Sequence, residues 1–248
     1  MLRCNSNFFK KAKDFLLYLF LPDTCYGCRA DLPMGACGPL CVHCQTHLQT
    51  PGPLICARCG KPLPDGGAHC YHCRGSKGKN FKCKIIRSAV VFGPQVRAVV
   101  HAFKYQDRAY LSGFLAERMA QEWDNYPPLS QAELLVPVPL FYRKEKQRGY
   151  NQAALLAEKL ARLKNMAWDK HALKRLRNTR SQTELGREGR LQNMQGAFVC
   201  ERPEAVKGKV ILLIDDVATT GATLEGCATA LKAAGAKKVM AYTFAREV

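Results

Sequence analysis

Residues 210–223 read Val-Ile-Leu-Leu-Ile-Asp-Asp-Val-Ala-Thr-Thr-Gly-Ala-Thr, and this stretch decides the fold of the chain. Five apolar residues predict a buried strand that ends in two carboxylates, and a Thr/Gly-rich turn then leads into a helix expected from about Ala222 to Ala234. In an open α/β sheet, ligands bind beyond the carboxyl ends of the strands. Backbone N–H groups of the turn and the positive end of the helix can hold a phosphate there. The carboxylates of Asp215 and Asp216 would repel that phosphate, so we expect a ribose, whose hydroxyls can donate to them, to lie in between.

The periodicity on either side of this segment predicts strands and helices that alternate along the chain. Strands are expected at 85–93, 134–138 and 238–244, and helices at 94–105, at 110–123 and at 150–163. This alternation predicts the α/β class, with a mostly parallel sheet flanked by helices on both faces. The polar stretch from Gly75 to Lys84 is the expected boundary, so the α/β domain would take residues 85–248.

Four Cys-x2-Cys pairs precede the sheet, and 11 of the 13 cysteines lie within the first 83 residues. The paired cysteines are Cys25, Cys28, Cys41, Cys44, Cys56, Cys59, Cys70 and Cys73. Two such pairs complete a tetrahedral zinc site. Residues 23–80 contain too little apolar matter to fold by hydrophobic burial, so metal binding would supply the missing free energy. Zinc is favoured over a disulfide framework because the chain has no credible secretion signal. We therefore expect a small double zinc ribbon with two structural Zn²⁺ ions.

The grouping of the four pairs is open at the level of sequence. A sequential arrangement joins the first pair to the second and the third to the fourth, whereas a cross-braced arrangement joins the first to the third. We favour the sequential arrangement because each half is then a complete unit with its own short loop. Either way four thiolates leave no open position for water, which predicts structural rather than catalytic zinc. His43, His69 and His72 could substitute as ligands, although an intact set of four cysteines does not need them.

Residues 1–22 are expected to form a short amphipathic helix, from Phe8 to Phe20, that docks its apolar face on the rest of the protein. Basic residues before the apolar run at 15–21 loosely resemble the start of a signal peptide, but Asp14 interrupts the approach and no small-x-small cleavage site follows. The run is far shorter than the ~20 residues of a membrane-spanning helix. These features predict a cytoplasmic protein without membrane insertion.

The net charge of +18 is concentrated in two parts of the chain. Residues 1–84 carry a net charge of +8 and residues 140–200 a net charge of +9, whereas the other two parts are nearly balanced. Such basic blocks attract phosphates. Composition does not distinguish the phosphates of nucleic acid from those of a small phosphorylated ligand.

Residues 210–223 closely resemble the phosphoribosyl pyrophosphate (PRPP) loop of type I phosphoribosyltransferases, and only Ala218 is smaller than the usual aliphatic residue. Residues 136–152, with Val-Pro-Val-Pro followed by Arg-Gly-Tyr-Asn-Gln, stand where that family has its pyrophosphate loop. Residues 175–198 resemble the flexible basic segment that closes over PRPP. With the cysteine pairs and the segment His101-Ala-Phe-Lys-Tyr105, the chain resembles the ComF family of phosphoribosyltransferase-like proteins over roughly residues 20–246. That family is associated with DNA uptake in naturally competent bacteria.

The resemblance implies Mg²⁺-PRPP as the ligand and gives roles to individual residues. Asp215 and Asp216 would hold the ribose hydroxyls, and residues 219–223 would surround the 5′-phosphate. The implied PRPP-binding residues are Asp215, Asp216, Val217, Ala218, Thr219, Thr220, Gly221, Ala222 and Thr223. Those implied to bind pyrophosphate are Arg143, Gly149, Tyr150 and Asn151. The arginines implied to act catalytically on the pyrophosphate are Arg148, Arg177, Arg180 and Arg187.

Two functions of different classes follow. The first is an enzyme that displaces pyrophosphate at the anomeric carbon through an oxocarbenium-like transition state, with an acceptor and a general base that the sequence does not identify. The second is a non-catalytic protein that senses PRPP or binds single-stranded DNA during uptake. The second is motivated by the basic blocks and by Phe141, Tyr142 and Tyr150, which could stack on bases. The basic cysteine-rich segment could also contact a helicase-like partner. Both functions keep the same PRPP loop, so the sequence does not separate them.

Two substitutions test this interpretation. Adjacent carboxylates at the end of a buried strand repel each other unless a ligand or a cation lies between them. On that basis Asp216→Asn is expected to weaken PRPP binding and to leave the stability of the free protein unchanged or higher. Cys28→Ser is expected to unfold the cysteine-rich segment and to leave the α/β domain largely folded, because that domain has its own core.

Overall fold

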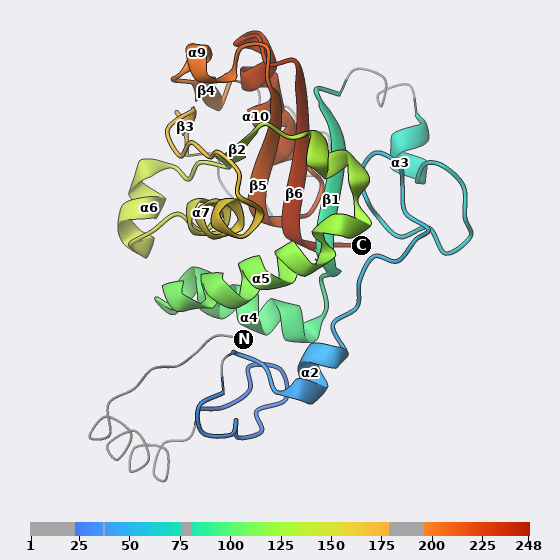
Figure 1. The fold of residues 1–248 in the computed structure, drawn as a ribbon, viewed down its shortest axis with the longest axis vertical. Helices are drawn as coiled ribbons and strands as arrows, with labels where there is room; N and C mark the ends of the chain where they lie inside the picture. The colour runs from blue at the N-terminus through green and yellow to red at the C-terminus, as the bar shows by residue number, and fades with distance from the viewer. Residues whose placement is uncertain (1–22, 37, 76–80, 179–195) are drawn as a thin grey trace.

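A four-stranded parallel sheet forms the centre of the protein (Figure 1). The computed structural model describes residues 23–36, 38–75, 81–178 and 196–248. The strands lie in the order β1 (Cys83–Val91), β6 (Lys238–Arg246), β5 (Val210–Ala218) and β2 (Leu134–Pro137). All three strand pairs are parallel. This arrangement confirms the α/β class that the alternation of strands and helices predicts.

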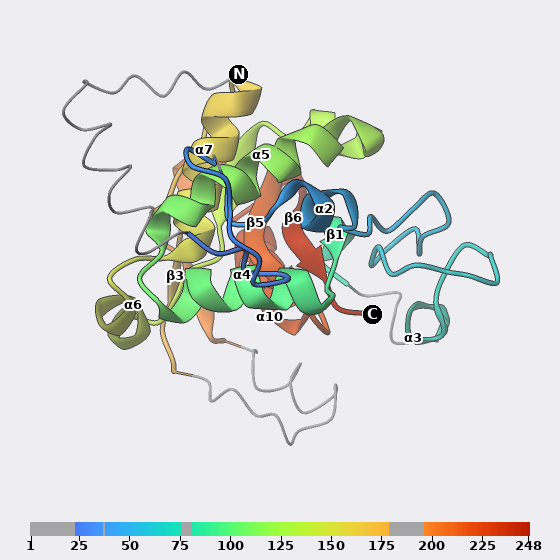
Figure 2. The same ribbon diagram turned by 90° about the horizontal axis from the view of Figure 1, so that it is seen from below.

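Alternate side chains of the central strands contribute to two separate hydrophobic cores. Leu212 and Ile214 of β5 belong to the core under α4 (Pro94–Tyr105), α5 (Ser112–Glu122) and α7 (Gln152–Lys164). Ile211 and Leu213 belong to the core under α10 (Ala222–Ala233). Figures 1 and 2 show α5 and α7 on one side of the sheet and α10 on the other. Burial on both faces explains why β5 is an unbroken apolar run rather than an alternating one.

One predicted helix has the expected ends, whereas two others differ for local reasons. The helix at Pro94–Tyr105 has the predicted bounds, with proline at its first position. Helix α7 begins at Gln152 because the Oδ1 atom of Asn151 caps it by accepting the N–H of Ala153 at 3.0 Å. The predicted helix at 110–123 is divided, since the 3₁₀ turns η2 (Ala109–Leu111) and η3 (Trp123–Asn125) flank α5.

Strand β5 continues past the predicted end at Ile214 as far as Ala218. Its register along β6 places Asp215 beside Thr243 and Val217 beside Ala245. Asp215 and Asp216 are therefore part of the strand rather than of the turn.

The remaining described elements are short. They are α2 (Val42–Thr46), α3 (Tyr71–Arg74), η4 (Pro127–Gln131), α6 (Tyr142–Arg148), α9 (Pro203–Val206) and the antiparallel strands β3 (Leu173–Arg175) and β4 (Phe198–Cys200). The helix expected within residues 1–22 and most of the basic segment expected at 175–198 lie outside the described residues. Within the described ranges, no helix combines the length and the apolar character needed to cross a membrane.

The two cysteine-rich halves contact different parts of the α/β domain. In the first half, residues 23–48, Leu32 and Leu40 share a core with Val96 of α4 and Leu115 of α5. The second half, residues 54–75, contains α3 and lies beside β1 at the edge of the sheet (Figure 1). The two halves are thus attached at different places, one under the helices and one against the sheet.

Candidate functional site

The turn between β5 and α10 corresponds to the expected phosphate loop, residues 219–223. Gly221 has a φ angle of +79°, which glycine adopts without strain. The hydroxyl of Thr220 accepts the N–H of Ala222 at 3.3 Å. Thr219 is exposed, and Thr220 and Thr223 are half-buried. The turn therefore presents hydroxyl groups together with the N-terminal end of a twelve-residue helix, a combination that suits an anion.

Arg246 at the end of β6 supports this turn from behind. Its side chain is buried, and Nη1 donates to the carbonyl of Ala218 at 3.1 Å and to the carbonyl of Thr219 at 2.8 Å. Because the two carbonyls are held by a guanidinium group, the peptide groups of the turn are oriented before a ligand binds.

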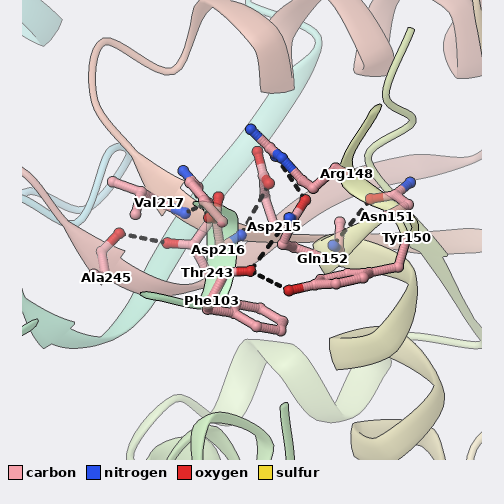
Figure 3. Close-up of polar contacts among 12 residues, drawn as sticks. Phe103, Arg148, Tyr150, Asn151, Gln152, Asp215, Asp216, Val217, Thr243 and Ala245 are labelled. Atoms are coloured by element: carbon pink, nitrogen blue, oxygen red, sulfur yellow. Dashed lines mark hydrogen bonds and ion pairs between the residues drawn. The ribbon is translucent and has the colours of Figure 1, made fainter. Parts of the chain in front are cut away.

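Asp216 is paired with a lysine from another element. Its side chain is buried, and Oδ2 lies 2.6 Å from the Nζ atom of Lys104 at the end of α4. Oδ1 accepts the N–H of Val217 at 2.8 Å (Figure 3). Burial by itself would lower the pKa of Lys104, but the Asp216 carboxylate raises it above the ordinary value. The chain itself thus supplies the cation that two neighbouring carboxylates require.

Asp215 has a different environment. Its Oδ1 accepts the N–H of Asp216 at 2.9 Å (Figure 3). Burial, together with the adjacent Asp216 carboxylate, raises the pKa of Asp215 to about 8, while Lys104 acts in the opposite direction. Burial and the adjacent carboxylate thus both oppose ionisation of Asp215, and a hydroxyl donor or a cation that binds there would favour it.

A cleft of about 560 Å³ opens at Lys104, the partner of Asp216, and cations form much of its lining. Lys104, Tyr105, Lys144 and Arg148 are among its residues. Arg148 donates from Nη1 to Oε1 of Gln152 at 2.8 Å (Figure 3), and its guanidinium carbon lies 5.0 Å from the centre of the Tyr105 ring. Burial lowers the pKa of Lys144, and the positive charges of Arg175 and Arg148 lower it further. This concentration of positive charge suits a polyanionic ligand.

The residues expected to bind pyrophosphate surround the turn between α6 and α7. Gly149 ends α6 in the left-handed conformation. The Tyr150 hydroxyl donates to the carbonyl of Phe103 at 2.6 Å (Figure 3). The Asn151 side chain caps α7 and also donates to the carbonyl of Val138 at 3.1 Å. The side chains of Tyr150 and Asn151 therefore tie the turn to α4 and to the residue that follows β2. Arg143 is exposed and donates from Nε to the Tyr142 hydroxyl at 2.8 Å.

The arginines expected to close over the ligand are only partly within the described residues. Arg148 lies in the cleft, and Arg177 is exposed just beyond β3, where its carbonyl accepts the Nε–H of Arg175 at 3.3 Å. Arg180 and Arg187 lie outside the described residues.

Several cations of the site were not assigned from the sequence. They include Lys104, Lys144, Lys146, Arg175 and Arg246. Burial lowers the pKa of Arg175, and Cys227 and the Asp215 carboxylate partly offset this effect. The only sequence signal for Lys104 was its place in the His101–Tyr105 segment, to which no chemical role was given. Lysine at a helix end is common, so the pattern alone did not separate Lys104 from surface charge.

The eight paired cysteines form two separate groups of four, as the sequential arrangement predicts. Within each group all Sγ atoms lie within 4.8 Å of one another. The Sγ atoms of Cys28 and Cys41 are 3.7 Å apart, and those of Cys59 and Cys70 are 3.6 Å apart. A zinc tetrahedron with Zn–S bonds of ~2.3 Å gives an S–S separation of ~3.8 Å. Both sets of four thiols therefore fit structural Zn²⁺.

The thiols of one group affect one another's ionisation. In the first group, N–H groups including those of Gly27 and Cys41 overcome burial and lower the pKa of Cys25 to about 6. Burial and the neighbouring Cys25 raise the pKa of Cys44 to about 12. One thiolate thus opposes the ionisation of the next, and a divalent cation removes that opposition.

Two parts of the chain match known protein families. Residues 16–74 match the family described as "Double zinc ribbon domain". Residues 146–247, which include α7, β5, α10 and β6, match the family described as "Phosphoribosyl transferase domain".

Similar proteins align along most of the chain. DNA utilization protein YhgH of Salmonella typhimurium is 30% identical over 92% of this chain and 99% of its own length. Competence protein F of Haemophilus influenzae is 28% identical over 90% and 96%, and Competence protein ComFC of Bacillus subtilis is 29% identical over 99% and 94%. A solved structure, the glutamine PRPP amidotransferase from B. subtilis complexed with ADP and GMP, is 18% identical over 54% of this chain and 26% of that chain, with a TM-score of 0.36.

Proposed function

The chain belongs to the ComF family, and from this membership we propose that it binds Mg²⁺-PRPP and transfers the phosphoribosyl group with release of pyrophosphate. The observation that carries the proposal is the order of three features: the phosphate loop, the carboxyl groups of Asp215 and Asp216, and the cationic cleft at Arg148. PRPP presents a 5′-phosphate, a ribose and a pyrophosphate in the same order.

The phosphate loop would hold the 5′-phosphate. The N-terminal end of α10 carries a partial positive charge, and helix N-termini donate backbone N–H groups to anions. The hydroxyls of Thr219, Thr220 and Thr223 add further donors. Arg246, which holds two carbonyls of the turn, reduces the reorganisation that the loop needs when the phosphate arrives.

The carboxyl groups of Asp215 and Asp216 would bind the ribose hydroxyls. The Asp216 carboxylate is paired with Lys104 at 2.6 Å, and its oxygen atoms can accept hydrogen bonds from hydroxyl groups. Mg²⁺ that enters with PRPP would neutralise part of the pyrophosphate charge, and the oxygen atoms of these two side chains are donors of the type that it prefers.

Transfer would break the bond between the anomeric carbon and the pyrophosphate oxygen, which keeps the bonding electron pair, while an acceptor atom forms a new bond to that carbon. Arg148 and Lys144, with Arg143 and the turn at residues 149–151, would stabilise the negative charge of the leaving pyrophosphate. Arg177, Arg180 and Arg187 would cover it. The Asp215 and Asp216 carboxylates would stabilise the positive charge that develops on the ribose. Such preorganised charges supply most of the rate enhancement in reactions of this type.

Titration calorimetry with PRPP and Mg²⁺ tests ligand binding, and ³¹P spectroscopy across a panel of nucleobases and amines tests transfer. The proposal expects binding in the calorimeter and pyrophosphate release with at least one acceptor. Binding without release across the panel would favour a PRPP sensor instead. Wild-type protein that binds no PRPP would contradict both.

Binding of single-stranded DNA is a second candidate function, favoured by two tyrosines, one in the lining of the cleft and one at the start of α6. Tyr105 and Tyr142 are exposed, and the guanidinium carbons of Arg148 and Arg143 lie 5.0 Å and 5.7 Å from their ring centres. Exposed rings beside cations are typical of surfaces on which unpaired bases stack. The names of the relatives refer to competence and to DNA utilization.

Fluorescence anisotropy with a labelled single strand tests this second function. Affinity should fall steeply as the salt concentration rises, because released counterions drive such binding. Tyr105→Leu should weaken binding, whereas Tyr71→Leu, an exposed tyrosine in the second cysteine-rich half, serves as the control. Absence of binding at low salt would exclude this function.

The cysteine-rich segment also bears on the cellular location and on a protein partner. Free thiols in two zinc groups require a reducing compartment, which supports a cytoplasmic location. The basic cysteine-rich segment would offer a surface to a helicase-like partner in DNA uptake.

A further inference from the structure

Arg58 connects the second group of zinc ligands to the helix that begins at the phosphate loop. It lies between the first two cysteines of that group, and its Nη2 atom is 3.7 Å from Oε2 of Glu225 in the first turn of α10. Both side chains are largely buried, with exposed fractions of 14% and 15%. Glu225 also accepts the backbone N–H groups of Lys82 at 2.5 Å and Cys83 at 3.2 Å. One carboxylate thus joins the second cysteine-rich half, the start of β1 and the start of α10.

Ile86 of β1 provides a second connection between the same two regions. Its N–H donates to the carbonyl of Arg58 at 2.7 Å. Gly60 approaches the strand so closely that a Cβ atom there would lie 2.6 Å from the carbonyl oxygen of Ile86. On the other side, the Cδ1 atom of Ile86 is 3.1 Å from the position that a Cβ of Gly221 would take. Ile86 is therefore packed between the second cysteine-rich half and the phosphate loop.

The first group of zinc ligands is attached elsewhere. A Cβ at Gly27 would lie 3.0 Å from the side chain of Gln95 in α4, and one at Gly38 would lie 3.3 Å from Phe114 in α5. Figure 1 shows this half beneath α4, whereas the second half lies beside β1. The two groups, each with four cysteine ligands, therefore support different parts of the α/β domain.

We infer that metal bound at Cys56, Cys59, Cys70 and Cys73 restrains the phosphate loop through Arg58 and Glu225, and that metal at the first group does not. Zinc at the second group fixes the turn that carries Arg58. Without it, Arg58 loses its fixed position, the first turn of α10 loses a partner, and residues 219–223 become more mobile. Arg58 and Glu225 are positioning residues for the loop. The effect on ligand affinity rests on the proposed function, whereas the restraint on the loop does not.

Hydrogen exchange measured on full-length, zinc-loaded protein tests the restraint directly. The matched pair is Cys73→Ser and Cys44→Ser, because each removes the buried last ligand of its group. Arg58→Met keeps all eight ligands and removes only the guanidinium, and Arg58→Lys restores a positive charge. Three quantities are measured for each variant. They are the zinc content, the exchange in residues 219–224 relative to the core of β5, and the affinity for Mg²⁺-PRPP.

We expect Cys73→Ser and Arg58→Met to accelerate exchange in residues 219–224 and to weaken PRPP binding by about two- to fivefold, the effect of losing one partly buried ion pair. Cys44→Ser should leave loop exchange unchanged relative to the β5 core, and Arg58→Lys should recover part of the loss. Arg58→Met protein with two zinc ions and wild-type loop exchange would overturn the inference, as would equal effects of the two cysteine variants. If the loop responds but wild-type protein binds no PRPP, the restraint stands and the proposed function fails.

Discussion

The ion pair between Lys104 and Asp216 reverses the effect on stability that the sequence predicts for Asp216→Asn. The sequence alone predicts that Asp216→Asn leaves stability unchanged or raises it, because one of two repelling charges is removed. In the structure, the substitution separates a buried ion pair of 2.6 Å and leaves the Lys104 ammonium without its partner. The free protein should therefore lose about 1–3 kcal/mol of stability, and its affinity for Mg²⁺-PRPP should fall about tenfold or more.

Calorimetry with PRPP checks the predicted loss of affinity, and thermal unfolding of the free protein checks the predicted loss of stability. Asp124→Asn is a suitable control because its carboxylate is 84% exposed and contacts Lys164 far from the loop. Unchanged PRPP affinity in Asp216→Asn would contradict the ribose role. An unfolding temperature at or above that of wild type would contradict the stabilising role of the ion pair.

The raised pKa of Asp215 predicts a stability that falls as pH rises. Its folded-state pKa is about 8, above the ordinary value of 3.8. Between these two values the folded protein keeps a proton that the unfolded chain releases, so the free energy of unfolding decreases with rising pH and levels off above the folded pKa. Asp215→Asn cannot titrate and should remove this contribution. Urea denaturation of both proteins across the window measures the difference, and parallel pH profiles would show that Asp215 is ionised in the folded state.

At the scale of elements, the turn that joins β5 to α10 depends on glycine at one position. Alanine at position 221 would have to adopt the φ angle of +79° and place its Cβ 3.1 Å from Ile86. Gly221→Ala should cost about 1–2 kcal/mol of stability and weaken PRPP binding. Gly113→Ala, in α5 and facing open space, should instead raise stability by about 0.5–1 kcal/mol. Chemical denaturation of both variants makes the comparison, and equal stabilities would exclude strain at the turn.

At the scale of the whole molecule, the zinc-binding halves are not independent of the α/β domain. Elemental analysis should find two Zn²⁺ per chain, and Cys28→Ser should retain about one. The sequence predicts that this variant leaves the α/β domain largely folded. However, Leu32 and Leu40 of the first half are buried in the same core as Val96 and Leu115. The unfolding temperature of the α/β domain should therefore also fall in Cys28→Ser. Cys200→Ser, a half-buried thiol outside both zinc groups, is the control and should change neither measurement. Wild-type stability in Cys28→Ser would show that the shared core contributes little.

Much of the architecture was predictable because its signals are local. The apolar run of β5, the proline that starts α4 and the paired cysteines each act over a few residues. Element ends were less predictable. Helix α7 begins at Gln152 because a side chain of Asn151 caps it, and β5 extends to Ala218 because β6 continues beside it. The identity of a strand follows from its own side chains, whereas its length also depends on its neighbour.

The sequence by itself determined the class of the sheet, the position of the Thr/Gly-rich turn after β5 and the two groups of four cysteines, since each is written in consecutive residues or in a fixed spacing. Only the tertiary structure decided which cations complete the site. Lys104 pairs with Asp216, Arg246 holds the carbonyls of the loop, and Arg58 reaches Glu225. Each of these contacts joins segments far apart in the chain, and among 38 lysines and arginines no local pattern marks the few that the fold brings to a carboxylate or a carbonyl. Their roles depend on the path of the backbone, because electrostatic interactions act through distance in space rather than along the sequence.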